Sequence, residues 1–133
     1  MIRMQVYKVG VDPQKRVPFV LLADSDIERL MPIYIGPFEA NAIASQLLGQ
    51  EFPRPLTHDL LATLIDHLDA PLERVVIDDL SKGTYFARLI LATPDGPISI
   101  DCRPSDGIAL ALRTRASIYA SDAVILGDSQ DDA

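Results

Sequence analysis

A strand runs directly into a helix at residues 97–112, which read PISIDCRPSDGIALAL. Alternation through Ile98, Ser99 and Ile100 is typical of a strand, and the apolar residues from Ile108 onward recur at helical spacing. Residues 32–48, PIYIGPFEANAIASQLL, repeat this arrangement, with a proline at the start of the expected helix. The two stretches therefore predict equivalent strand-to-helix units in the two halves of the chain.

The pattern on either side of these stretches predicts three strands before each helix. In the first half we expect strands at 2–9, 17–22 and 30–35, and in the second half strands at 72–80, 84–93 and 97–100. A middle helix is expected from Thr57, with an apolar stripe at Leu60, Leu61, Leu64, Ile65 and Leu68, then a last strand at 117–120 and a helical turn at 122–126. Strands joined by short turns are antiparallel. The prediction is an α+β fold built from a duplicated βββα unit, with mostly antiparallel strands and helices packed on the sheet.

Composition predicts one globular domain. Hydrophobic residues make up 48% of the 133 residues and charged residues 23%, which is an ordinary globular mixture. We expect the domain to cover residues 1–127 and an acidic disordered tail to follow at 128–133. Two sets of edge strands would need covering, so a homodimer is also expected.

Charge and cysteine content restrict the function and the compartment. The net charge of −7 and the scattered basic residues disfavour a passive nucleic-acid-binding module. Cys102 is the only cysteine, which rules out an intrachain disulfide and agrees with a reducing compartment. The chain has no long apolar run and no signal-peptide pattern, so we expect a cytoplasmic protein that does not enter a membrane.

Candidate site residues cluster in the two strand-to-helix loops, Gly36–Glu39 and Asp101–Asp106. Helix N-termini favour anions because their backbone N–H groups are free. The structural interpretation is that the acids interact with the helix dipoles while Arg103 forms an ion pair that fixes its loop. The functional interpretation is that Glu39, Asp101 and Asp106 hold Mg²⁺ or Mn²⁺ and Arg103 binds a phosphate.

Two histidines and one cysteine complete the set of candidates. His58 lies near the start of the middle helix and is a candidate for acid–base work, although a surface histidine at a helix start is the structural alternative. His67 is nine positions further on, on the opposite side of that helix, and is expected to face solvent. We expect Cys102 to be buried and inert.

Three blocks of sequence resemble the bifunctional nuclease family. They are Pro32–Gly36 with Glu39-Ala40, then RPLTHDLL at 54–61, and finally IDCRPSDGIALA at 100–111. Cys102 and Gly107 depart from the alanine more usual in the family, while the charged frame of the last block is kept. The resemblance covers nearly the whole chain and implies a hydrolase that acts as both DNase and RNase.

Two functions follow for testing. The first is a divalent-metal-assisted nuclease, with Glu39, Asp101 and Asp106 as metal ligands, Arg103 on the phosphate, and His58 or Asp59 assisting proton transfer. The second is a noncatalytic ligand-binding or protein-interaction domain with an anion pocket at the helix N-termini.

Overall fold

The computed structural model describes residues 1–125, so the predicted tail at 128–133 lies outside the described residues. Seven strands form one sheet in the order β3-β2-β1-β7-β4-β5-β6. The elements along the chain are β1 (Ile2–Val11), β2 (Pro18–Ala23), β3 (Leu30–Tyr34), α1 (Pro37–Leu47), α2 (Thr57–His67), β4 (Leu72–Ser81), β5 (Thr84–Thr93), β6 (Gly96–Cys102), α3 (Pro104–Thr114) and β7 (Ser117–Ala120).

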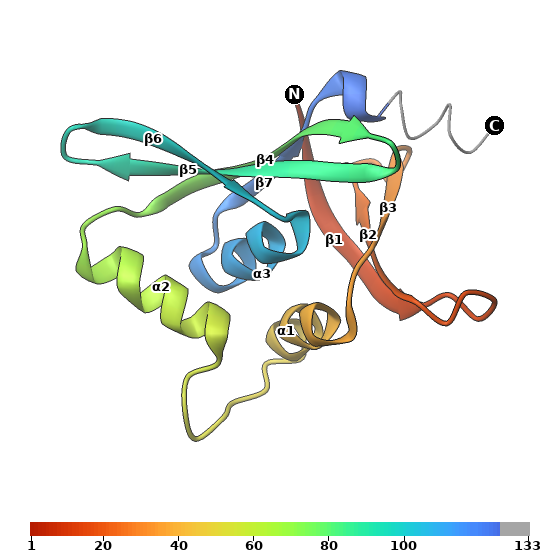
Figure 1. Cartoon of the computed structure of the whole chain (residues 1–133), viewed down its shortest axis with the longest axis horizontal. Coiled ribbons are helices and arrows are strands. Elements are labelled where there is room, and N and C mark those ends of the chain that lie inside the picture. The colour runs from red at the N-terminus through yellow and green to blue at the C-terminus, as the bar shows by residue number, and fades with distance from the viewer. Residues whose placement is uncertain (126–133) are drawn as a thin grey trace.

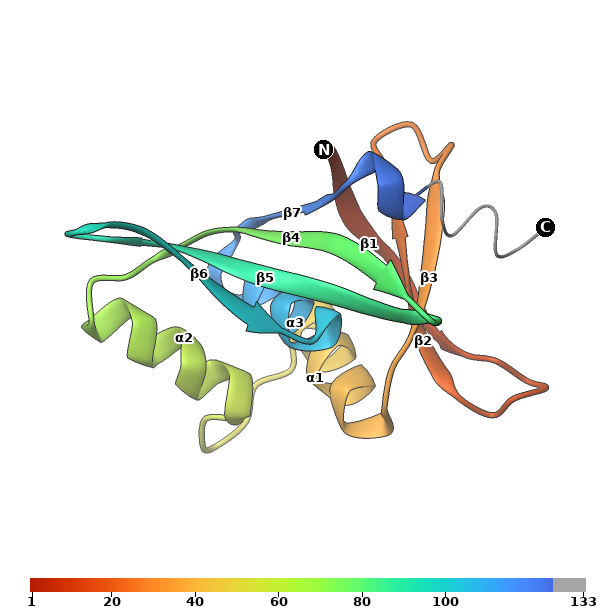
Figure 2. The same cartoon turned by 45° about the horizontal axis from the view of Figure 1, so that its top comes forward.

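The sheet is antiparallel except where β4 and β7 pair in parallel. It bends sharply, so that β1 to β3 stand steeply against β4 to β6, and α1 and α3 lie in the angle between them (Figures 1 and 2). Pro32 pairs with Leu21 in the edge strand β3, where a missing backbone N–H is tolerated. The predicted α+β class and mostly antiparallel sheet are confirmed. Each half also has the predicted βββα order, whereas descent of the halves from one duplicated unit stays a prediction.

Helix α3 is the most deeply buried helix of the described chain. Its small residues allow close packing on the sheet, and a Cβ added to Gly107 would lie only 2.7 Å from Cγ1 of the buried Val75. Two carbon atoms that are not bonded to each other cannot lie this close, so an alanine at position 107 would force Val75 or the helix to shift. The glycine at position 107 therefore allows α3 to lie close against Val75 on β4.

We expect Gly107→Ala to lower the free energy of unfolding. Crowding in a packed core costs roughly 1–3 kcal/mol, and the better helix propensity of alanine returns about 1 kcal/mol, so the net loss is about 1 kcal/mol. Urea denaturation measures it. The loss should shrink when Val75→Ala is also present, and an equal loss in both backgrounds would show that Val75 is not the obstacle.

Helix α2 packs mainly on α3 rather than on the sheet. Its predicted apolar stripe is only partly buried: Leu60, Leu64 and Leu68 are exposed, while Ile65 packs against the core. The stripe stays partly exposed because α2 contacts mainly one neighbouring helix, at its side. The predicted homodimer is not tested by this arrangement and stays a prediction that sedimentation velocity can check.

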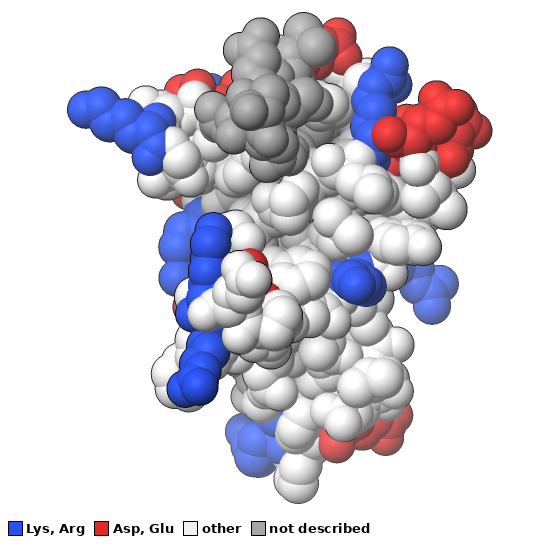
Figure 3. Space-filling view, turned by 90° about the vertical axis from the view of Figure 1, so that its right-hand side faces the viewer, with Lys and Arg blue, Asp and Glu red and all other residues white. Residues whose placement is uncertain are grey.

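Figure 3 shows Lys and Arg in several separate groups on the face that carries the β1–β2 hairpin, with most visible acids near the top and bottom. Among residues 1–125, no helix is long and apolar enough to cross a membrane.

Candidate functional site at three helix N-termini

The N-termini of all three long helices meet at one place in the fold. Glu39 lies in the first turn of α1, His58 in the first turn of α2, and Asp106 in the first turn of α3. Arg103 directly precedes α3, and Pro104 occupies the first helical position. The two predicted loops are thus brought together, and the start of α2 joins them.

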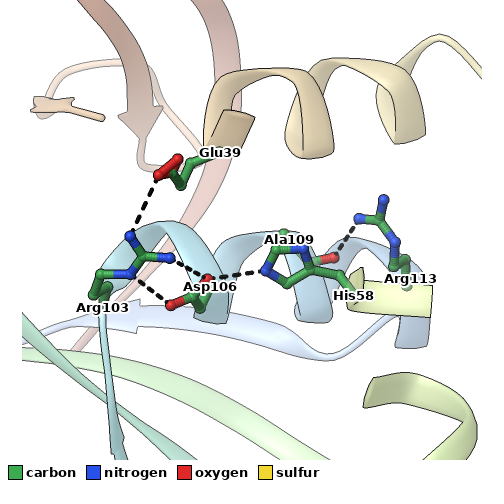
Figure 4. A network of polar contacts seen from close by, with 6 residues as sticks. All are labelled: Glu39, His58, Arg103, Asp106, Ala109 and Arg113. Carbon is green, nitrogen blue, oxygen red and sulfur yellow. Dashed lines mark hydrogen bonds and ion pairs between the residues drawn. The ribbon is translucent and has the colours of Figure 1, made fainter. Parts of the chain in front are cut away.

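Arg103 is the centre of a network of charged contacts (Figure 4). Its Nε lies 2.8 Å from Asp106 Oδ2 and its second terminal nitrogen 3.0 Å from Asp106 Oδ1, which is a two-pronged contact. The other terminal nitrogen donates to Glu39 Oε1 at 3.3 Å. The hydrogen bonds that Arg103 donates to Asp106 raise the pKa of Arg103, which stays charged. Even so, 64% of the Arg103 side chain is exposed, so it is accessible to a ligand.

His58 contacts the same carboxylate from α2. Its Nε2 lies 2.9 Å from Asp106 Oδ1, and the residue is buried, unlike the exposed His67. A neutral imidazole that donates from Nε2 leaves Nδ1 unprotonated as an acceptor. Asp106 thus orients His58 and holds Arg103 at once.

Burial by itself would raise the pKa of Asp106, but the hydrogen bonds from Arg103 and His58 outweigh it and lower that pKa. A carboxyl group with a lowered pKa stabilises the fold fully above its unfolded pKa, about 3.9, and loses this contribution as the pH falls through its folded pKa. The unfolding free energy of wild type should therefore exceed that of Asp106→Asn near neutral pH, with a gap that narrows below about pH 4. Urea denaturation between pH 7 and pH 3 tests this, and a gap independent of pH would contradict it.

Glu39 is held less completely than Asp106. Its Oε2 is buried and has no hydrogen-bond partner among the described residues. The carboxylate lies against Gly36, where an added Cβ would be 2.7 Å from Oε1. Gly36 therefore makes room for the Glu39 carboxylate, whose one charged partner within residues 1–125 is Arg103.

These side chains line a cavity of about 530 Å³. Its residues come from the starts of the three helices and the loop before α2, and are Phe38, Glu39, Asn41, Ala42, Pro55, Leu56, Thr57, His58, Arg103 and Asp106. Converging helix N-termini, one guanidinium and one histidine favour an anionic ligand in this space.

Asp101 does not join the network, contrary to the predicted ligand set. Cys102 faces α3, since its Sγ would lie 3.4 Å from a Cβ on Gly107. Successive strand residues point to opposite faces, so Asp101 projects from the other face of β6, where it is exposed. Among residues 1–125, no three His, Cys, Asp or Glu side chains are grouped so as to hold a metal ion.

Asp59 also lies outside the cavity lining, in contrast to its predicted part in proton transfer. One oxygen accepts the backbone N–H of Leu56 at 2.9 Å, and the other lies 2.6 Å from Nε of Arg113, whose side chain is 5% exposed. The hydrogen bond from Leu56 is the main cause that lowers the pKa of Asp59, and Arg113 adds to it. Both oxygens are engaged, so Asp59 ties the start of α2 to α3.

We expect Asp59→Ala to act on stability rather than on chemistry. It leaves a buried guanidinium without its carboxylate, which should lower the unfolding free energy by about 2 kcal/mol, while activity of the folded protein changes little. Asp66→Ala, an exposed acid on the same helix, is the matched control. A large loss of turnover in Asp59→Ala at a temperature where it stays folded would restore its catalytic assignment.

Cys102 is half-buried, slightly more accessible than predicted. Burial raises the pKa of its thiol to about 11, with the charges of Asp106 and Asp101 acting in the same direction. The thiol is therefore protonated near neutral pH and is a poor nucleophile.

Comparison with known proteins places the chain in a family. The model of the bifunctional nuclease domain matches residues 20–132, a range that contains every residue of the network. The chain belongs to the bifunctional nuclease domain family. This confirms the resemblance read from the three sequence blocks.

Two kinds of relative were found. An uncharacterized protein of Mycobacterium tuberculosis is 43% identical over 122 residues, covering 92% of this chain and 73% of that protein. Bifunctional nuclease 1 of Oryza sativa subsp. japonica is 26% identical over 105 residues, covering 77% of this chain and 32% of that protein. The bifunctional nuclease of Oryza minuta matches to the same extent.

Sequence reasoning missed two features of the site. It treated His58 and Asp106 as separate candidates, although they share a hydrogen bond across 48 positions. It also overlooked Phe38, which is 86% exposed on the cavity wall. A large apolar residue in the first turn of a helix, between the helix-starting Pro37 and the acidic Glu39, was the available signal for an exposed aromatic ring.

Proposed function

We propose that this family member is a nuclease that hydrolyses phosphodiester bonds of DNA and RNA in the cavity at the three helix N-termini. The observation that carries the proposal is the chain of contacts from His58 through Asp106 to Arg103 along one wall of that cavity. Membership of the bifunctional nuclease domain family supports it. The domain is acidic overall, so substrate recognition would rely on this local site rather than on general attraction to phosphates.

In this proposal Arg103 binds the scissile phosphate. A guanidinium presents several N–H donors in one plane and takes two phosphate oxygens at once. Its contact with Glu39 is the longest in the network, at 3.3 Å, and is the one that a phosphate would replace. The two-pronged contact with Asp106 remains and keeps the guanidinium oriented.

His58 would act as the general base. Asp106 accepts a hydrogen bond from Nε2–H of His58, which leaves Nδ1 free to take a proton from the attacking water while the water oxygen bonds to phosphorus. The bond from phosphorus to the leaving oxygen then breaks, and that oxygen receives a proton from the imidazolium or from solvent. Arg103 offsets the charge that gathers on the two non-bridging oxygens.

The metal expected from the sequence does not fit this donor set. Glu39 and Asp106 flank Arg103, whose three donor nitrogens already occupy three of the four carboxylate oxygens. A cation placed between the two carboxylates would compete with the guanidinium for the same oxygens. The roles proposed for Arg103, Asp106 and His58 therefore do not depend on a divalent metal ion.

The test is cleavage of fluorescent DNA and RNA oligonucleotides by purified protein with Mg²⁺, Mn²⁺ or EDTA. Cleavage that survives EDTA, and that is lost in Arg103→Ala, is the expected result. Cleavage equally strong in wild type and Arg103→Ala would indicate a contaminating nuclease and contradict the proposal. Cleavage only with a metal would reinstate metal assistance.

A noncatalytic anion-binding domain is the second candidate. The observation in its favour is that two carboxylates already neutralise Arg103, as in an ion pair that only fixes a loop. A thermal-shift screen with nucleotides and sugar phosphates separates the two functions. Stabilisation by a metabolite, without any cleavage of nucleic acid, would favour this candidate.

A further inference from the structure

A second cavity, of about 430 Å³, lies on the other side of the contact between Arg103 and Glu39. These two residues line both cavities. A phosphate bound at Arg103 therefore has a hollow on each side of it. A continuous nucleic-acid strand needs this arrangement, because every phosphate is flanked by two nucleotides.

Each cavity has an exposed aromatic ring in its wall. Phe38 lines the first, and Tyr34, which is 48% exposed, lines the second. The Tyr34 hydroxyl donates to Asp12 at 3.0 Å, and Lys15 Nζ lies 4.5 Å from the ring centroid, so the ring is held in place. Unpaired bases stack on such rings, whereas the bases of a duplex are already stacked on each other.

Two basic residues directly precede residues that line the second cavity. Val17 and Gly83 line it, and they follow Arg16 and Lys82 in two separate turns. Both basic residues have left-handed backbone conformations, with φ of 56° and 52°, as expected at tight turns. The surface over the β1–β2 hairpin carries several separate basic groups and few central acids (Figure 3). The next phosphate of a strand leaving the second cavity would meet positive charge there.

We propose that the second cavity binds the nucleotide next to the phosphate held by Arg103, and that the substrate is an unpaired strand. The strand runs from Phe38 over Arg103 to Tyr34 and then past Lys82 and Arg16. This inference rests on the proposed nuclease function and assigns its substrate class. It also accounts for how an acidic domain holds nucleic acid, since the strand would contact Arg103 and then pass Lys82 and Arg16.

The experiment measures binding apart from cleavage. Fluorescence anisotropy follows an eight-nucleotide oligothymidylate and a hairpin duplex on His58→Gln protein, which is expected to bind without cutting. Adding Tyr34→Ala should weaken single-strand binding roughly 5- to 100-fold, the range for the loss of one stacked base, while Tyr34→Phe keeps it.

Adding Lys82→Gln should make the slope of log affinity against log salt concentration less steep by roughly 0.7, the contribution of one phosphate contact. Arg115→Gln, which removes an exposed charge at the other end of α3, should leave the slope unchanged.

The outcomes separate the two proposals. His58→Gln protein could bind the oligothymidylate equally well with and without the added Tyr34→Ala or Lys82→Gln substitution. Together with normal cleavage by wild type, this result would overturn the strand path and leave the nuclease proposal intact. Tighter binding of the duplex than of the single strand would also overturn it. Single-strand binding that depends on Tyr34, together with no cleavage by wild type, would support the strand path and overturn the nuclease proposal. Circular dichroism confirms that each variant is folded.

Discussion

Replacing Arg103 with alanine is expected to lower the rate of nucleic-acid cleavage by about 100- to 1000-fold, the usual cost of removing one preorganised donor to a developing negative charge. Among residues 1–125, Arg103 supplies the only guanidinium in the cavity lining. Without it, no residue offsets the charge on the phosphate oxygens. Initial rates on a fluorescent single-stranded oligonucleotide measure the loss.

The design of the Arg103 series separates charge from geometry. Arg103→Lys keeps the charge but presents one ammonium in place of a planar fork, so it should recover little of the rate. Arg115→Ala, an exposed arginine that ends α3, should keep the wild-type rate. Recovery of full activity in Arg103→Lys would show that simple charge suffices and that the two-pronged contact is dispensable.

Replacing His58 with glutamine is expected to lower the same rate by about 100- to 10,000-fold, the range for removal of a general base. Glutamine keeps a donor for Asp106 but has no group that accepts a proton near neutral pH. The network around Arg103 should therefore survive, so binding is retained while turnover is lost.

The chain offers a matched control on the same helix. His67→Gln changes an exposed residue at the far end of α2 that does not line the cavity. It should leave turnover unchanged. Equal turnover by His58→Gln and His67→Gln would remove His58 from the mechanism.

Much of the fold could be predicted because local signals agreed with each other. Prolines at 37 and 104 mark the starts of two helices directly after alternating strands, and the structure places both at the first helical position. The expected element order follows from these signals and from the turns between strands. The partial exposure of the α2 leucines could not be predicted, since periodicity identifies an apolar face without saying what covers it.

The candidate site was predicted in part for similar reasons. Glu39 and Asp106 were expected to lie close to one another, and both contact Arg103, because each lies in the first turn of a helix. Asp101 was expected in a loop, but β6 continues to Cys102, so Asp101 lies within the strand. Neighbouring residues of a strand point to opposite faces of the sheet, and Asp101 therefore points away from the network. The pairing of His58 with Asp106 depends on how α2 packs against α3, which no local pattern specifies.

The most direct measurement is a crystal structure of the His58→Gln protein with a bound single-stranded oligonucleotide. We expect a phosphate on the Arg103 guanidinium in place of Glu39, with one base beside Phe38 and the next beside Tyr34. An oligonucleotide bound elsewhere, with Arg103 still joined to both Glu39 and Asp106, would contradict the assignment of this cavity as the active site.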